Sequence, residues 1–222
     1  MLSLSSEQKA VCLKCGVEKR HYLARLLMCG GTRLLREKFD SIHKRENLEL
    51  ILNDPAIRTK LKDFLLDQEW DLLYVRNSWK FTSSANFDFG LTLELLRTIH
   101  SFVPRVMDWR TMPDGFSFEE DLARIDRYCS SIYRQEMTDA RFNYLWKATS
   151  EAFLRIAGGI SLEKRSEWEI SIDKFLQEPL TSPEGNEYVD QLGRWALRRL
   201  VLLMRQEGNR IFEKNQTLGK YK

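Results

Sequence analysis

Two neighbouring segments of the chain carry mostly apolar residues at the three- and four-residue spacing of an α-helix. These residues are Phe118, Leu122, Ile125, Cys129 and Ile132 in the first segment, and Phe142, Leu145, Trp146, Thr149, Ala152, Phe153 and Ile156 in the second. Each set shares one helical face, which has to be buried against other parts of the protein. Because the connection between the segments is short, we expect the two helices to pack as an antiparallel hairpin.

The rest of the chain favours the same fold class. Glycine and proline are scarce, with 11 and 5 residues among 222, and no stretch alternates apolar and polar residues convincingly. We therefore predict an all-α protein. Further helices are expected at residues 6–38 (with a possible break near Gly30-Gly31), 48–52, 56–66, 87–103, 162–177 and 186–212. The expected core contains Leu93, Leu96, Ile125, Phe142, Trp146 and Phe153.

Two prolines suggest how the chain is divided. Pro179 and Pro183 lie in a segment, residues 178–185, that has the composition of a linker. We expect a helical bundle at residues 1–160 and a helical extension at 161–222, with the linker near 178–185. A chain of this length, with 43% hydrophobic residues, can bury a substantial core.

The charge balance gives little indication of a nucleic-acid or membrane ligand, because 35 basic and 32 acidic residues leave a net charge of only +3. The last predicted helix carries Arg194, Arg198, Arg199, Arg205 and Arg210. Such a face can bind RNA phosphates, anionic lipid or an acidic partner, but a solvated helix face is the favoured interpretation. The apolar segment 195–204 contains two of these arginines and is too short to span a bilayer, so no membrane association is expected.

Metal and cofactor sites are not expected. Cys12 and Cys15 have zinc-ligand spacing, but Cys29 and His21 do not supply a second matching pair. The chain also contains no glycine-rich phosphate-binding motif. With Cys129, the cysteines are interpreted as free thiols of a cytoplasmic protein, because no signal peptide is recognised in the first ten residues.

Several stretches of the chain occur in an order and spacing shared with one known family. They are Phe39-Asp40-Ser41-Ile42-His43, residues 70–74 and 87–97, Trp109 with Pro113, residues 121–125 with Tyr128, and Phe142, Trp146, Leu154 and Arg155. Together, over about residues 22–158, they resemble the HEPN domain of the DAZ-interacting zinc-finger ubiquitin-ligase type. One departure is Lys44-Arg45, which follows His43 where the family usually has proline. The resemblance implies an HEPN-like helical bundle that commonly pairs face to face.

Active HEPN domains are metal-independent ribonucleases whose motif is an arginine followed a few residues later by a histidine. The resemblance places that motif directly after Tyr128, where this chain has Cys129, Ser130 and Arg134 at the positions of arginine, asparagine and histidine. Histidine moves protons near neutral pH, whereas arginine stays protonated. A second match, from Arg36 to His43, lies outside the helix that carries the family's site. The resemblance therefore implies a pseudoenzyme without catalytic residues.

The favoured interpretation is a catalytically inactive HEPN-type interaction or adaptor module, with a protein partner or a homodimer formed through its helical bundle. The alternative is an RNA-binding protein, or a residual ribonuclease, that uses the degenerate site as a phosphate pocket. The candidate phosphate ligands are then Arg124, Arg127 and Arg134.

Overall fold

The computed structural model of the chain describes residues 16–74, 83–100 and 115–219. The first described part is one continuous helical rod made of α1 (Gly16–Arg25), a π-helical turn η1 (Leu26–Gly31) and α2 (Thr32–Ile42). Gly30 and Gly31, where a break was considered, stay helical. A β-carbon on Gly31 would come within 2.9 Å of the Phe89 ring, and one on Gly30 within 3.0 Å of the Phe175 ring. These glycines therefore allow close packing rather than a turn.

Three short helices follow at one end of the molecule: α3 (Arg45–Asn53), α4 (Pro55–Lys62) and α5 (Asp67–Leu73). The start of α4 is fixed locally, because the Asp54 carboxylate accepts hydrogen bonds from the backbone N–H groups of Ala56 (2.8 Å) and Ile57 (3.1 Å). Pro55 occupies the first helical position, where its missing N–H costs nothing. The apolar centre of the fold then holds a 3-10 turn η2 (Ser84–Asn86), α6 (Phe89–Leu95) and a second π-helical turn η3 (Leu96–His100).

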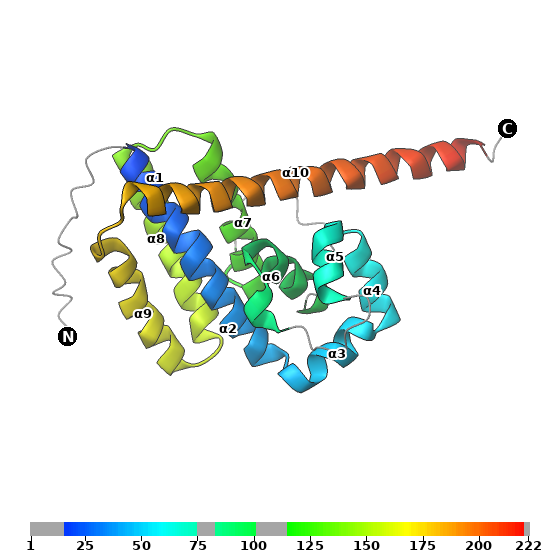
Figure 1. Ribbon diagram of the computed structural model, residues 1–222, viewed down its shortest axis with the longest axis horizontal. Helices are drawn as coiled ribbons and strands as arrows, with labels where there is room; N and C mark the ends of the chain where they lie inside the picture. Colours follow the sequence, from blue (N-terminus) through cyan, green and yellow to red (C-terminus); the bar gives the residue numbers. More distant parts are fainter. Residues whose placement is uncertain (1–15, 75–82, 101–114, 220–222) are drawn as a thin grey trace.

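The expected pair of helices is present as α7 (Phe118–Arg134) and α8 (Asp139–Gly158), which pack against each other. Thr138 caps α8 as expected, accepting a hydrogen bond from the N–H of Arg141 at 3.3 Å. α9 (Leu162–Gln177) packs on α8, and α10 (Ser182–Gly219) packs along α1 and contacts α7 and α6. Figure 1 shows α10 crossing the bundle and continuing beyond α5.

The predicted linker is shorter than expected, because α10 already begins at Ser182 rather than at residue 186. Pro183 is therefore inside the first turn of the helix, where proline is tolerated, and does not keep the chain irregular. Thr181 helps to start the helix, since its hydroxyl donates to the Glu184 carboxylate at 2.6 Å. The helix also ends later than predicted, at Gly219.

One hydrophobic core joins the helices. It includes the predicted residues Leu93, Leu96, Ile125, Phe142 and Phe153, and also side chains of α9 and α10: Trp168, Ile172, Leu192 and Trp195. The prediction for Trp146 was wrong in degree, because this ring is only partly buried and packs on the edge of the core beside Phe142. The division into a bundle at 1–160 and an extension at 161–222 stays a prediction.

The all-α fold class is confirmed: within the described ranges the regular structure is helical and no strand occurs. Among these same residues, no helix combines the length and the apolar character that crossing a membrane requires.

Candidate functional site

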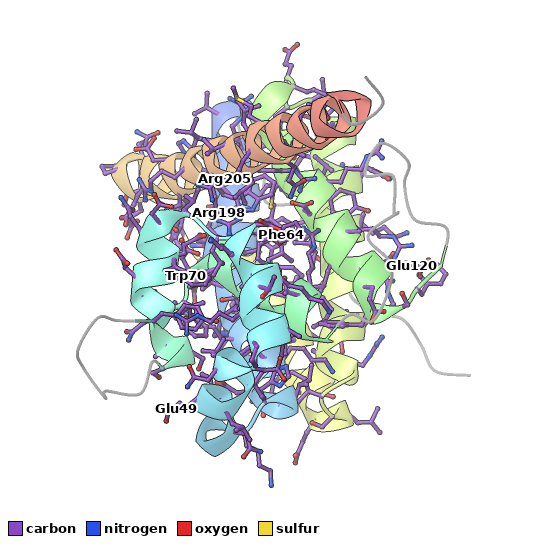
Figure 2. All side chains as sticks on the ribbon, turned by 90° about the vertical axis from the view of Figure 1, so that its right-hand side faces the viewer. Glu49, Phe64, Trp70, Glu120, Arg198 and Arg205 are labelled. Carbon is purple, nitrogen blue, oxygen red and sulfur yellow. The ribbon has the colours of Figure 1, made fainter. Side chains whose placement is uncertain are left out.

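The helix that corresponds to the family's active-site helix is α7, and its start is fixed by a capping box. The Ser117 hydroxyl accepts from the N–H of Glu120 at 3.2 Å, and the Glu120 carboxylate accepts from the N–H of Ser117 at 2.7 Å. These hydrogen bonds, the one from the Ser117 backbone first, hold the pKa of Glu120 below its usual value. Figure 2 shows Glu120 at the edge of the molecule, where α7 begins. The capping box sets the helix register that places the motif positions.

Cys129, at the position of the family's arginine, lies on the core side of α7. Its side chain is completely buried, as are those of Ile125 and Ile132 at the neighbouring positions of the same face. Burial raises the pKa of the Cys129 thiol well above its usual range. The thiol is therefore neutral at neutral pH, and it is shielded from any ligand in solution.

Ser130 and Arg134, the other two motif positions, fall on a different side of the helix. The Ser130 side chain is partly exposed, and its hydroxyl lies 3.3 Å from the backbone oxygen of Asp126. Arg127 is also partly exposed, and its seven-residue distance from Arg134 puts both arginines on one face of α7. The backbone of Arg134 ends the helix, while its side chain lies outside the described atoms. The two motif ends, 129 and 134, thus do not share a face.

Arg124, the third candidate phosphate ligand, is buried in a cluster inside the protein. It lies 2.8 Å from the carboxylate of Asp121, donates to the backbone oxygen of Gly115 and lies under the exposed ring of Phe116. Arg155 of α8 approaches the same carboxylate at 2.7 Å. A phosphate at Arg124 would have to compete with Asp121, which is only 1% exposed. The structure therefore brings Arg124 and Arg155 together, but does so around a carboxylate.

A second buried carboxylate, Asp126, lies on α7 between these positions and Cys129. Arg97 of η3 is 3.0 Å from it, and Arg199 of α10 also forms an ion pair with it. The neighbouring Arg198 pairs with Glu69 of α5, with 2.9 Å between Nη2 and Oε2. Figure 2 shows Arg198 and Arg205 beneath α10 on the side of Phe64. The Arg198 Nη2 lies 3.2 Å from the Phe64 backbone oxygen.

The expectation of a solvated basic face on the last helix was therefore wrong for Arg198, which is 7% exposed, and incomplete for the partly buried Arg199. Sequence reasoning missed Asp121, Asp126 and Arg97 as members of the site. One local signal was available, because Asp121 and Arg124 are three residues apart on one helix. The partners of Asp126 come from distant parts of the chain and had no such signal.

Tyr128 precedes the motif and is also unsuited to proton transfer. Burial raises its pKa to about 12, and the neighbouring Tyr144 raises it further, while Arg124 and Arg155 act in the opposite direction. The remaining match, Arg36 to His43, is split between two environments. Arg36 Nε donates to the backbone oxygen of Phe87 at 2.6 Å, whereas the His43 ring packs on Phe39.

Metal binding can be examined only in part. Among the residues for which the structure gives positions, no three metal-binding side chains gather at one point. Cys12 and Cys15 lie outside those residues, so the expectation that they do not bind zinc stays a prediction. Cys29 is exposed and Cys129 is buried, and both are free thiols.

Comparison with known proteins places this arrangement in a family. The human protein named E3 ubiquitin-protein ligase DZIP3 is 26% identical over 172 residues, which cover 72% of this chain and 13% of the human protein. The mouse protein of the same name is 26% identical over 148 residues, covering 61% of this chain and 12% of the mouse protein. This chain thus spans about an eighth of the length of either relative. No solved structure matches the chain. The family described as DZIP3/hRUL138-like HEPN matches residues 45–187, well over half of the chain, and the chain therefore belongs to that family.

Proposed function

We propose that this chain is an HEPN-type interaction module that has lost ribonuclease catalysis. The observation that supports the proposal is the complete burial of Cys129 on the core side of α7. Cleavage of RNA without a metal needs a group that moves a proton and a positive charge that stabilises the phosphate in the transition state. A neutral thiol enclosed by Ile125 and Ile132 supplies neither.

The charged side chains around the motif support the same proposal. Asp121 and Asp126 are each paired with two arginines, so these four arginine side chains already have carboxylate partners inside the fold. Such pairs hold α6, α7, α8 and α10 together. The module then acts through its surface, as a cytoplasmic adaptor that binds another protein or a second copy.

The test of lost catalysis compares the purified protein with two variants. We expect no cleavage of a single-stranded RNA oligomer in the presence of a chelator, and no difference between the unaltered chain, Arg134→Ala and Arg127→Ala. Cleavage that disappears in either variant would contradict the proposal, because it would show that this helix face still carries out chemistry.

A second candidate function, RNA binding without cleavage, is favoured by one specific arrangement. Arg127, Ser130 and Arg134 share the face of α7 that points away from Cys129, and two exposed aromatic rings, Phe116 and Tyr144, lie near Arg155 and Tyr128. Exposed aromatic rings next to arginines can stack on unpaired bases. Binding of a single-stranded oligomer that weakens steeply with salt and is lost in Arg127→Ala would favour this candidate over the first.

A further inference from the structure

The C-terminal part of α10 exposes an apolar stripe that its own chain does not cover. Leu197, Leu200, Val201 and Met204 follow one another at spacings of three, one and three residues, and are 62%, 47%, 40% and 67% exposed. This stripe lies on a different side of α10 from Trp195, Arg198 and Leu202, which face the bundle and are buried. A monomer gains nothing from aligning four large apolar side chains in water, so the stripe indicates an interface.

The sequence continues this pattern to the end of the helix. Leu197, Met204, Ile211 and Leu218 are spaced by seven residues, and Val201, Gly208 and Asn215 form a second seven-residue series between them. Two interleaved series of this kind are the pattern by which one helix pairs with another in a coiled coil. Figure 1 shows that this part of α10 extends past α5, so a second helix can reach it. The family match ends at residue 187, before the stripe begins.

Gly208 provides an independent indication. A β-carbon at this position would meet no atom within 4 Å, so nothing in the chain's own fold requires glycine there. Glycine inside a helix costs about 0.5–1 kcal/mol relative to alanine. Its place in the middle of the apolar stripe is explained if another helix approaches closely at that point.

We propose that α10 pairs with α10 of a second copy in an antiparallel coiled coil, and that this second copy is a partner of the interaction module proposed above. Antiparallel pairing centred between residues 209 and 210 places Val201 level with Leu218 of the second copy. It places Gly208 level with Ile211 of the second copy, so that a large residue meets the small one. Glu207 then lies within one helical turn of Lys214 of the second copy, which adds opposite charges beside the apolar seam.

A parallel pair fits less well. The same stripe continues toward the start of α10 with the exposed residues Asp190 and Arg194. In a parallel pair in register, each of these charges would lie beside its own copy, and Gly208 would face Gly208 and leave a gap. In the antiparallel pair both charges lie beyond the overlapping part, and the two bundles extend in opposite directions.

The molar mass in solution, measured by sedimentation over a range of concentrations, tests the proposal on the full chain. We expect twice 26.3 kDa at micromolar concentration. The double variant Leu197→Glu/Met204→Glu should weaken the dimer at least about a hundredfold, because two unpaired carboxylates would enter an apolar seam. Ile170→Glu on α9 is the matched control, since Ile170 is 61% exposed and Leu197 is 62% exposed. It should leave the dimer intact, and circular dichroism should show that both variants remain folded.

Two further variants separate the arrangement from a generic sticky surface. Gly208→Leu should raise the helix content and yet weaken the dimer, which a glycine without an interface role would not do. Glu207→Lys and Lys214→Glu should each weaken the dimer, and the two together should restore it. A monomeric unaltered chain, or a dimer that survives Leu197→Glu/Met204→Glu, would overturn the proposal. Neither result would affect the RNA-cleavage test, so failure of this inference is distinguishable from failure of the proposed loss of catalysis.

Discussion

Arg155 of α8 holds Asp121 of α7 by two parallel contacts, from Nε to Oδ2 at 2.8 Å and from Nη2 to Oδ1 at 2.7 Å. Planar pairing of this kind is among the stronger side-chain interactions in proteins. The pair also raises the pKa of Arg155, with the hydrogen bond to Asp121 as the largest cause. The interaction ties the two helices of the hairpin together at the level of the candidate site.

Asp121→Ala should therefore destabilise the protein by about 3–5 kcal/mol, because Arg124 and Arg155 would lose the carboxylate that compensates their charge. Glu151→Ala is a suitable control on α8. Its pair with Lys147 is solvent-exposed, with 4.0 Å between the charged atoms, and such pairs contribute little. Urea denaturation measures both free energies of unfolding, and equal effects of the two substitutions would contradict the structural role given to Asp121.

Trp168 and Trp146 should differ strongly in their contribution to stability. Trp168 is 1% exposed, donates from Nε1 to Glu37 at 3.0 Å and packs edge-on against Phe153. Trp168→Ala is expected to cost about 3–5 kcal/mol. Trp146→Ala should cost less, roughly 1–2 kcal/mol, because a partly exposed ring gives up less apolar area. Thermal unfolding of the two variants decides the order, and a larger loss for Trp146→Ala would refute the packing described.

The thiol of Cys129 should be chemically silent in the folded protein. In a variant in which Cys12, Cys15 and Cys29 are replaced by serine, a thiol reagent should react only after denaturant is added. The matched variant that keeps Cys29 in place of Cys129 should react at once, because Cys29 is exposed. Rapid reaction of Cys129 in the native state would show that position 129 opens to solvent and could receive a ligand.

Rebuilding the family's arginine at this position should harm the fold rather than restore activity. Cys129→Arg would place a guanidinium among Ile125 and Ile132, and an uncompensated buried charge costs about 3–5 kcal/mol. Ser130→Asn, at a partly exposed position, should change stability by less than about 0.5 kcal/mol. If Cys129→Arg is as stable as the unaltered chain and cleaves RNA, the proposed inactive state is wrong.

Tyr128 predicts a pH effect on stability. Its pKa of about 12 in the fold lies above the usual value near 10 of an unfolded tyrosine. The fold therefore favours the protonated phenol, and this contribution is complete below pH 10 and lost as the pH rises toward 12. In Tyr128→Phe that loss should be absent, so the difference in unfolding free energy between the two proteins should shrink between pH 10 and 12. A difference that stays constant over this range would exclude the predicted shift.

Much of the fold follows from local patterns that need no tertiary information. The apolar spacing of α7 and α8, the caps at Ser117 and Thr138 and the proline at the start of α4 depend on residues within one or two helical turns. The placement of the degenerate motif also followed from the sequence, since its residues lie together after Tyr128. What the motif positions can do chemically did not follow, because burial depends on what packs against the helix.

The sequence by itself determined the helical class, most helix positions, the family and the side of α7 that Cys129 occupies. Only the tertiary structure decided that Arg198 is buried against Glu69, that Asp126 receives Arg97 and Arg199, and that Trp146 remains at the edge of the core. The physical reason is range: helical periodicity and capping are local interactions, whereas these ion pairs join residues that are far apart in the chain. The exposure of the α10 stripe was likewise a tertiary result, because the same apolar spacing would equally suit a buried helix.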